Sequence, residues 1–212
     1  MAVQTSLFDE AIPPDQAVTH DLGDALIQEY PHAFPSTVTN SLLRQLLESI
    51  PWQQETIRIA GRMIDVPRLQ CWMGDRASCY GYSGIRLQPI SWTPLVQSIR
   101  ERVESLTSER FNSVLLNYYR NGQDSVAWHA DDEPELGPAP LIASVSFGAQ
   151  RQFQFRPKQR ESAKTPQKFQ MLLRDGSIIV MGNTVQNKWM HQLPKEKNLD
   201  LPRVNLTFRN II

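Results

Sequence analysis

Apolar residues recur at helical spacing in two segments of the first half of the chain. Across residues 36–50 they stand three and four positions apart, after Pro35 and Ser36, and Pro51 ends the run. Residues 92–106 repeat this pattern, with arginine and glutamate opposite the apolar stripe. Such a stripe must be buried, so we expect both helices to lie on a larger apolar surface.

From Phe111 onward the chain shows short alternating or apolar runs separated by turn residues, among them Gly148, Gly176 and Gly182. We expect strands at 111–119, 141–147, 151–156, 169–173, 177–181, 188–193 and 203–209. Many strands after two helices indicate an α+β fold with a double-stranded β-helix, or jelly-roll, core and two supporting helices.

The chain length of 212 residues suits one domain. Residues 1–19 contain a Pro13-Pro14 pair and scattered acids, so we expect a flexible arm there. The remainder, 20–212, is expected to form a single domain whose jelly roll covers about 111–212.

Charge and cysteine content exclude few classes of protein. Lysine plus arginine and aspartate plus glutamate each total 22, so net charge provides no argument for a nucleic-acid partner. The two cysteines do not make a disulfide framework. No apolar stretch approaches the roughly 20 residues of a membrane span. We expect a cytoplasmic monomer without membrane association.

Three polar residues are candidate metal ligands. His129 and Asp131 are two positions apart, so in an extended segment both side chains point to the same face. His191 is distant in sequence but falls on a late expected strand. Two histidines and one carboxylate form the facial triad of non-haem Fe(II) oxygenases. A surface loop or a zinc hydrolase site remains an alternative for these residues.

The last expected strand alternates strictly. Val204, Leu206 and Phe208 share one face, and four polar residues share the other: Arg203, Asn205, Thr207 and Arg209. An amphipathic strand in water is one interpretation. Two guanidinium groups on one face would also suit a dicarboxylate such as 2-oxoglutarate. Asn117 and Tyr119 share parity and could add hydrogen bonds from a neighbouring strand.

Several motifs together resemble one family: N-x-Y, H-x-D-D-E, I-A-S-V-S-F-G, F-x-F-R, a later histidine and P-R-V-N-L-T-F-R. In order and spacing, from about Val66 to the C-terminal end, they are similar to the AlkB family of Fe(II)- and 2-oxoglutarate-dependent nucleic-acid dealkylases, closest to its animal DNA-repair members. The resemblance implies Fe(II), 2-oxoglutarate and O₂. It also implies that Arg203 holds the distal carboxylate with Tyr119, and that the rest of the pocket is lined by Asn117, Asn205, Thr207 and Arg209.

The resemblance also implies a nucleotide-recognition lid at about 52–90. Tyr82 and His129 would sandwich an extruded base, since chemistry on a stacked base requires flipping it out. Contacts to the base or its backbone are expected from Arg68, Tyr80, Asp132 and Glu133. For each tyrosine alone, a half-buried core ring is an equal interpretation.

One segment departs from the duplex-specialised relatives, in which a hairpin carries an aromatic wedge. Here that hairpin has Ile59 and Ala60 near the wedge position, so a strong duplex preference is not indicated. An apolar wedge from Ile59 or Met63 remains open.

The implied function is oxidative demethylation of 1-methyladenine and 3-methylcytosine in single-stranded or duplex DNA, with release of formaldehyde, succinate and CO₂. Alternatives are a dioxygenase acting on RNA or a protein side chain, and a catalytically silent nucleic-acid-binding module. The protein would be nucleoid-associated in a bacterium and nuclear in a eukaryote.

In the arm, Gln4, Leu7 and Phe8 resemble the Q-x-x-L-F peptide that docks bacterial repair proteins on the sliding clamp. A disordered tail is the plainer interpretation.

Overall fold

The computed structural model describes residues 12–59, 61–75, 80–82, 85–87, 89–159 and 168–212. Its elements follow in chain order. They are β1 (Val18–Asp21), β2 (Leu26–Tyr30), α1 (Ser36–Ser49), β3 (Gln53–Ile59), β4 (Arg62–Gly74), β5 (Tyr80–Tyr82), β6 (Ile85–Leu87), α2 (Pro94–Thr107), β7 (Ser113–Tyr119), β8 (Val126–His129), β9 (Ile142–Gly148), β10 (Arg151–Pro157), β11 (Phe169–Leu173), β12 (Ile178–Met181), α3 (Asn183–Lys188), β13 (Trp189–Leu193) and β14 (Arg203–Arg209).

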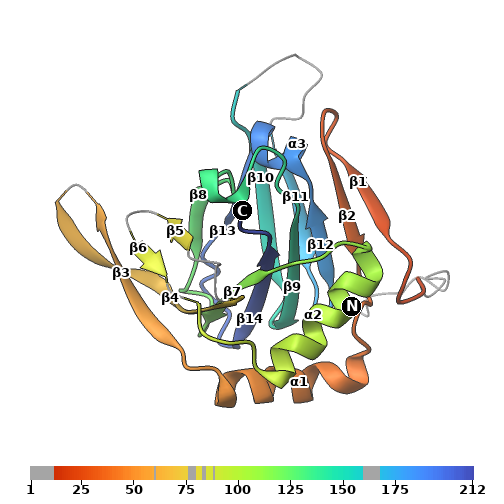
Figure 1. Cartoon of the computed structure of the whole chain (residues 1–212), viewed down its shortest axis with the longest axis horizontal. Helices are drawn as coiled ribbons and strands as arrows, with labels where there is room; N and C mark the ends of the chain where they lie inside the picture. Colours follow the sequence, from red (N-terminus) through yellow and green to blue (C-terminus); the bar gives the residue numbers. More distant parts are fainter. Residues whose placement is uncertain (1–11, 60, 76–79, 83–84, 88, 160–167) are drawn as a thin grey trace, which may run out of the picture.

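Two antiparallel sheets form the core (Figure 1). The larger has the order β1-β2-β12-β9-β14-β7-β4-β3 and the smaller the order β11-β10-β13-β8. Strands distant in sequence are therefore neighbours, as β14 is between β7 and β9. The expected jelly roll with two supporting helices is confirmed.

The two helices cover the outer face of the larger sheet (Figure 1). Leu46 of α1 and Val96, Ile99 and Val103 of α2 are buried in one cluster with Phe208 and other residues of the sheet. Burial of these stripes accounts for both helices, because an isolated helix of 14 residues is marginal in water. The side chain of Thr93 caps α2 by accepting a hydrogen bond from the amide of Val96 at 3.3 Å.

A second apolar cluster fills the space between the sheets, with Leu115, Phe155 and Trp189 among its buried members. Along β14 the residues Val204, Leu206 and Phe208 face the helices. The alternating polar residues of β14 therefore face the space between the sheets, and the pleat of one strand places four polar side chains inside the molecule.

The structure adds elements beyond the expected ones. β1 and β2 form an antiparallel pair that extends the larger sheet beside β12, and β1 includes Val18 and Thr19. α3 is a short helix between β12 and β13. These segments are only four to six residues long, so periodicity alone does not reveal them. No helix within the described ranges is both long and apolar enough to cross a bilayer.

Glu104 links α2 to the following strand and supports a stability prediction. Its buried carboxylate accepts hydrogen bonds from Arg100 at 2.9 Å, Arg110 at 2.6 Å and the Phe111 amide at 3.0 Å. Burial alone would raise the pKa of Glu104, but these bonds outweigh burial and lower it. A glutamate with a lowered pKa in the folded protein stabilises it above the unfolded value, and this contribution is lost as the pH falls.

We expect Glu104→Gln to lower the free energy of unfolding by about 1–3 kcal/mol at pH 7. The difference from the wild type should shrink below about pH 4.3, the ordinary glutamate pKa. Urea unfolding at several pH values measures this. Glu101→Gln, at an exposed position of the same helix, is the control. An equal loss of stability at all pH values would show that the charge of Glu104 is not the source of the stabilisation.

Candidate active site

Three side chains converge where β8 meets β13. His129 ends β8, Asp131 follows two residues later, and His191 lies directly opposite His129 in the antiparallel pair. One potential ligand atom from each lies within 4.8 Å of the others. The structure therefore brings together the three residues expected to bind a metal ion.

Neighbouring groups orient these ligands. Nδ1 of His129 lies 2.9 Å from the Ala127 carbonyl oxygen, which can only accept, so Nδ1 carries the proton and Nε2 keeps its lone pair. Arg209 donates to the Asp131 carboxylate at 2.6 Å. The Asp131 amide donates to the side chain of Gln186 at 3.0 Å. His129 and Asp131 are thus held in place by the protein itself.

Electrostatics favours the metal-binding protonation states. Burial lowers the pKa of His129, and it lowers the pKa of His191 to about 3 with help from neighbouring His129. Burial by itself would raise the pKa of Asp131, but Arg209 and the two histidines outweigh it and lower the value. At neutral pH the site consists of two neutral imidazoles and a carboxylate.

These residues fit an iron ion. Nε2 of His191 lies 3.9 Å from Asp131 Oδ2, which is too far for a hydrogen bond but suitable for two ligands of one ion. Three protein ligands leave coordination positions open for a cosubstrate and O₂. Zinc accepts the same ligand types, so the groups beside the ligands must discriminate between the two metals.

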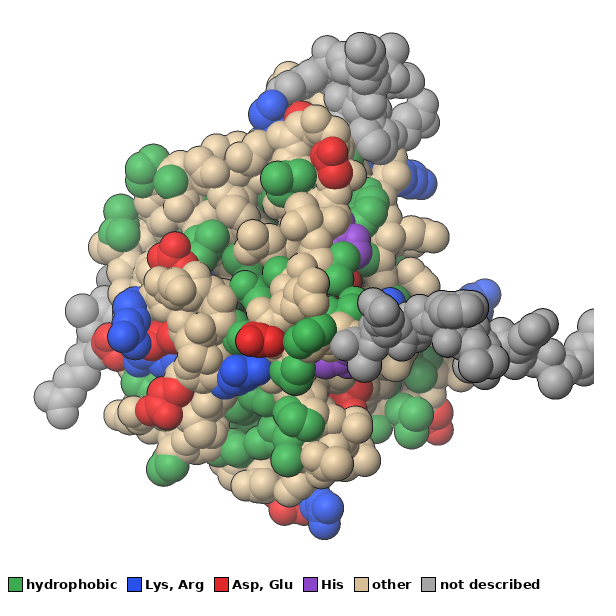
Figure 2. Space-filling view, turned by 90° about the vertical axis from the view of Figure 1, so that its right-hand side faces the viewer, with side chains coloured by type: hydrophobic (Ala, Val, Ile, Leu, Met, Phe, Trp, Pro, Cys, Tyr) green, Lys and Arg blue, Asp and Glu red, His purple; other side chains and the backbone are tan. Residues whose placement is uncertain are grey.

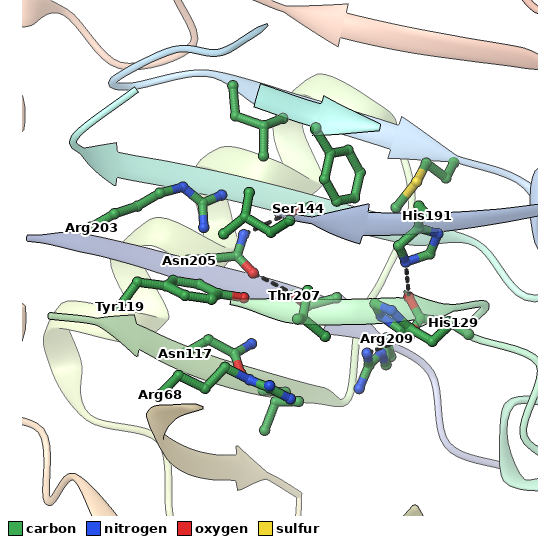
Figure 3. Close-up of a pocket in the computed structure, with 17 residues that line it drawn as sticks. Arg68, Asn117, Tyr119, His129, Ser144, His191, Arg203, Asn205, Thr207 and Arg209 are labelled. Atoms are coloured by element: carbon green, nitrogen blue, oxygen red, sulfur yellow. Dashed lines mark hydrogen bonds and ion pairs between the residues drawn. The ribbon is translucent and has the colours of Figure 1, made fainter. Parts of the chain in front are cut away.

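A cavity of about 60 Å³ adjoins the metal ligands (Figure 3). All four polar residues of β14 line it, and each is buried. It is also lined by Asn117 and Tyr119 of β7, which pair with Asn205 and Arg203 of β14. All six residues expected to contact the cosubstrate therefore lie around one cavity.

Arg203 is the most unusual of them. It is only 2% exposed, and burial lowers its pKa to about 10, so it remains charged at neutral pH. It donates to the hydroxyl of Ser146 at 2.9 Å, and its guanidinium lies 5.2 Å from the Tyr119 ring centre. Its Nε is buried without a hydrogen-bond partner, and no ion pair within the described ranges joins Arg203 to a carboxylate. A buried cation of this kind is costly, which favours an anionic ligand.

Hydrogen bonds fix the middle of the cavity wall. Asn205 donates to Ser144 at 2.7 Å and accepts from Thr207 at 2.9 Å. Asn117 accepts from Arg68 and from Gln70, both at 2.8 Å. These contacts hold the amide groups in one orientation, which is what selective recognition of a small polar ligand requires.

The two arginines of β14 occupy opposite ends of this wall (Figure 3). Six residues of strand place their backbones about 20 Å apart. Arg203 and Tyr119 lie at one end, and Arg209 lies beside His129 and His191. The structure therefore separates the expected pair: Arg203 is free to meet a carboxylate, whereas Arg209 is bonded to Asp131.

A larger groove of about 550 Å³ opens on two of the metal ligands, His129 and Asp131. Arg68, His129, Asp131 and Arg209 line both spaces. Ile57 and other residues of the β3–β4 hairpin form one wall, and β8 with the end of β13 forms the other. A second reactant could thus reach the metal ligands through this groove.

Only some of the residues expected to contact the substrate line the groove. Arg68 and Glu133 line the groove. Asp132 lies outside the lining of both spaces, half exposed and paired with Lys158 at 2.5 Å. Tyr80 and Tyr82 belong to β5, but their side chains lie outside the described part of the structure.

The candidate wedge residues lie at the tip of the β3–β4 hairpin, where Gly61 turns with φ of +80°. Met63 is 63% exposed on β4. Ile59 ends β3, while its side chain and all of Ala60 lie outside the described residues. An exposed apolar side chain at the tip keeps the wedge hypothesis open.

Some residues at the site were missed by sequence reasoning. Ser144 and Ser146 contact Asn205 and Arg203, and their shared parity in the strand expected at 141–147 was an available signal. Gln186 of α3 had no comparable signal. Arg151 is fully buried and donates to the carbonyl oxygens of Asp124 and Pro194, which joins the loops beside Tyr119.

A jelly roll with two histidines and one carboxylate at one end of a cavity, and a buried arginine without a carboxylate partner at the other, is typical of a non-haem iron oxygenase with an acidic cosubstrate. The model of the 2OG-Fe(II) oxygenase superfamily matches residues 27–209. The chain belongs to this superfamily, whose members use Fe(II), 2-oxoglutarate and O₂, and within it to the AlkB family.

Two relatives and one solved structure show how far the likeness extends. The chain is 40% identical over 175 residues to human alpha-ketoglutarate-dependent dioxygenase alkB homolog 3, a match covering 80% of this chain and 60% of that protein. It is 36% identical over 199 residues to mouse DNA oxidative demethylase ALKBH2, covering 91% and 83%. The structure of OsALKBH1 matches the fold with a TM-score of 0.57 at 14% identity, covering 91% of this chain and 100% of that one. The chain thus spans about 60% of the alkB homolog 3 relative.

Proposed function

We propose that this protein is an Fe(II)- and 2-oxoglutarate-dependent dioxygenase that removes alkyl groups from nucleic-acid bases in DNA repair. The arrangement of the two spaces carries the proposal: a small polar cavity with a buried cation and a larger groove share His129 and Asp131. Each reactant then has its own access to one metal ion. The name of mouse ALKBH2, DNA oxidative demethylase, supports the reaction type.

The roles of the residues follow from their positions. His129, Asp131 and His191 would hold Fe(II), which supplies the activation of O₂ that accompanies oxidative decarboxylation of 2-oxoglutarate to succinate and CO₂. Arg203, with Ser146 and Tyr119, would bind the distal carboxylate. Asn117, Asn205 and Thr207 would line the middle of the cosubstrate site, and Arg209 would keep Asp131 charged and oriented. Hydroxylation of the alkyl carbon yields a hemiaminal, which collapses to formaldehyde and the restored base.

Two carboxylates of the groove would favour a base that carries positive charge, while Arg68 and Lys195 line other parts of it. Glu133 and Asp65 line it, and carboxylates near a flipped base stabilise a cation over a neutral base. 1-Methyladenine and 3-methylcytosine are cationic, whereas the repaired bases are neutral. Repair would therefore weaken the binding of the product, which helps its release.

We expect the purified protein with Fe(II), ascorbate and 2-oxoglutarate to demethylate 3-methylcytosine in a single-stranded oligonucleotide. Mass spectrometry follows the oligonucleotide, and a succinate assay follows the cosubstrate. Matched duplex DNA, RNA and a methylated peptide test the alternatives for the substrate. Succinate formation with an unchanged oligonucleotide would exclude this DNA substrate and retain the dioxygenase.

Glu133→Gln is expected to raise the KM for 3-methylcytosine about tenfold, because an uncharged amide does not attract a cationic base. Asp132→Asn is the matched control, since its carboxylate contacts Lys158 outside the groove. Steady-state kinetics on the same oligonucleotide measures both variants. If the KM rises only for Asp132→Asn, the cationic base is recognised by Asp132 and not by Glu133.

Finer features belong to the same proposal. We propose one domain over residues 20–212 with a lid at about 52–90, Tyr82 stacking on the base, a monomeric state and a cytoplasmic or nuclear location. Gln4, Leu7 and Phe8 lie outside the described residues, and docking of this segment on a sliding clamp is testable by pull-down with a Leu7→Ala, Phe8→Ala double variant. On the face drawn in Figure 2, basic and acidic side chains are interspersed, so contacts with DNA would depend on local groups.

A further inference from the structure

The outer face of the smaller sheet, beside the groove, carries an aromatic side chain that the reaction does not use. His129 and His191 point between the sheets, and Trp128 lies on the opposite face with Arg156 and Met190. The pairing of β8 with β13 is irregular between His191 and Leu193. Bulges are common next to active sites, and Trp128 beside this one lines the groove.

Trp128 and Arg156 form a partly exposed stack, with the guanidinium over the ring. The guanidinium of Arg156 lies 4.5 Å from the ring centre of Trp128, and its Nη2 lies 3.8 Å from the Met190 sulfur. Trp128 is half-buried and Arg156 is exposed. Tryptophan rings and guanidinium planes are the surfaces on which unpaired nucleic-acid bases stack.

The charges around this stack favour an anion. Neither Arg156 nor Lys195 makes an ion pair with any carboxylate in the described part of the chain. Lys195 and Gln192 line the groove together with Trp128, so the stack is continuous with the path to His129. Gln192 also donates to Gln154 on the same outer face at 2.7 Å, which adds amide groups that can bond base edges.

We propose that Trp128 and Arg156, with Lys195 at the rim, form a platform for a nucleotide that flanks the modified base in single-stranded DNA. The flanking base would stack on the Trp128–Arg156 pair, and its phosphate would meet Arg156 or Lys195. This inference rests on the proposed function, since it assigns a place to the neighbour of the base that enters the active site. It also gives the enzyme a reason to prefer an oligonucleotide to an isolated nucleotide.

The test compares a five-nucleotide strand that contains one central 3-methylcytosine with the mononucleotide 3-methyl-dCMP. Trp128→Ala should raise the ratio of the KM for the strand to the KM for the mononucleotide about tenfold. Trp128→Phe should stay within about twofold of the wild type, because it keeps an aromatic face. Gln170→Ala, exposed on β11 of the same sheet, is the matched control and should change neither value.

A second measurement separates this inference from the proposed reaction. Fluorescence anisotropy of a labelled, unmethylated strand, without iron or 2-oxoglutarate, should show about tenfold weaker binding for Trp128→Ala and a reduced salt dependence for Arg156→Gln. Arg156 is exposed, so its variant remains informative if Trp128→Ala fails to fold. Wild-type affinity in both Arg156→Gln and a folded Trp128 variant would overturn the platform, even where demethylation occurs. Weaker binding by these variants without any demethylation by the wild type would retain the platform and reject the reaction.

Discussion

Replacing His191 with alanine is expected to abolish turnover, with a loss of at least about a thousandfold in succinate formation. His191 is 2% exposed and is directly opposite His129, so no other described histidine or acid can take its place in the ligand set. Two remaining ligands would hold Fe(II) weakly. Metal analysis of the purified variant, together with the succinate assay, measures both losses.

Asp132→Ala is the matched control for the metal site. Asp132 is adjacent to the ligand Asp131, but its carboxylate contacts Lys158 and lies outside both spaces. It should therefore keep wild-type iron content. An Asp132→Ala variant that loses iron while His191→Ala retains it would contradict the proposed ligand set.

Arg203→Met is expected to raise the KM for 2-oxoglutarate at least about thirtyfold, since losing one partner of a buried charged pair costs about 2 kcal/mol or more. The buried guanidinium has an Nε without a hydrogen-bond partner, and its side-chain partners are the hydroxyls of Ser146 and Tyr119 rather than a carboxylate. A carboxylate would satisfy both its charge and its geometry. Succinate formation over a range of 2-oxoglutarate concentrations measures the effect.

Two further variants make the cosubstrate result specific. Arg203→Lys keeps a positive charge without the planar fork, so its KM should fall between those of the wild type and Arg203→Met. Arg102→Met, on α2 and remote from the cavity, should leave the KM unchanged. Iron content should be the same in all of them. A wild-type KM in a folded Arg203→Met variant would exclude Arg203 as the carboxylate ligand.

The two separate spaces suit the two reactants of the proposed reaction. The small cavity is lined by the polar side chains of β14 and β7 together with apolar ones, whereas the groove is wider and mainly apolar, with residues such as Ile57 and Val66 on one wall. A flat aromatic base suits the second and a short dicarboxylate suits the first. Because His129 and Asp131 lie between them, neither reactant has to leave for the other to bind.

Local pattern was sufficient where a short stretch of chain determines the outcome. The helices at 36–50 and 92–106 were predicted from their stripes, and the alternation of β14 placed Arg203 and Arg209 on one polar face. The spacing of His129 and Asp131 placed them on one side of an extended segment. Each of these conclusions depends on the backbone geometry of a few consecutive residues. That geometry can be predicted from the periodicity of the sequence.

Contacts between distant segments were decided only by the tertiary structure. The pairing of β13 with β8 brings His191 opposite His129, and β1 and β2 join the larger sheet although their own pattern is weak. Only the packed structure shows that Arg209 bonds to Asp131 while Arg203 stays without a carboxylate, and that Glu133 rather than Asp132 lines the groove. Periodicity assigns a face to a residue, but the partner on that face is set by which strands become neighbours, and that choice is made by the burial of the whole core.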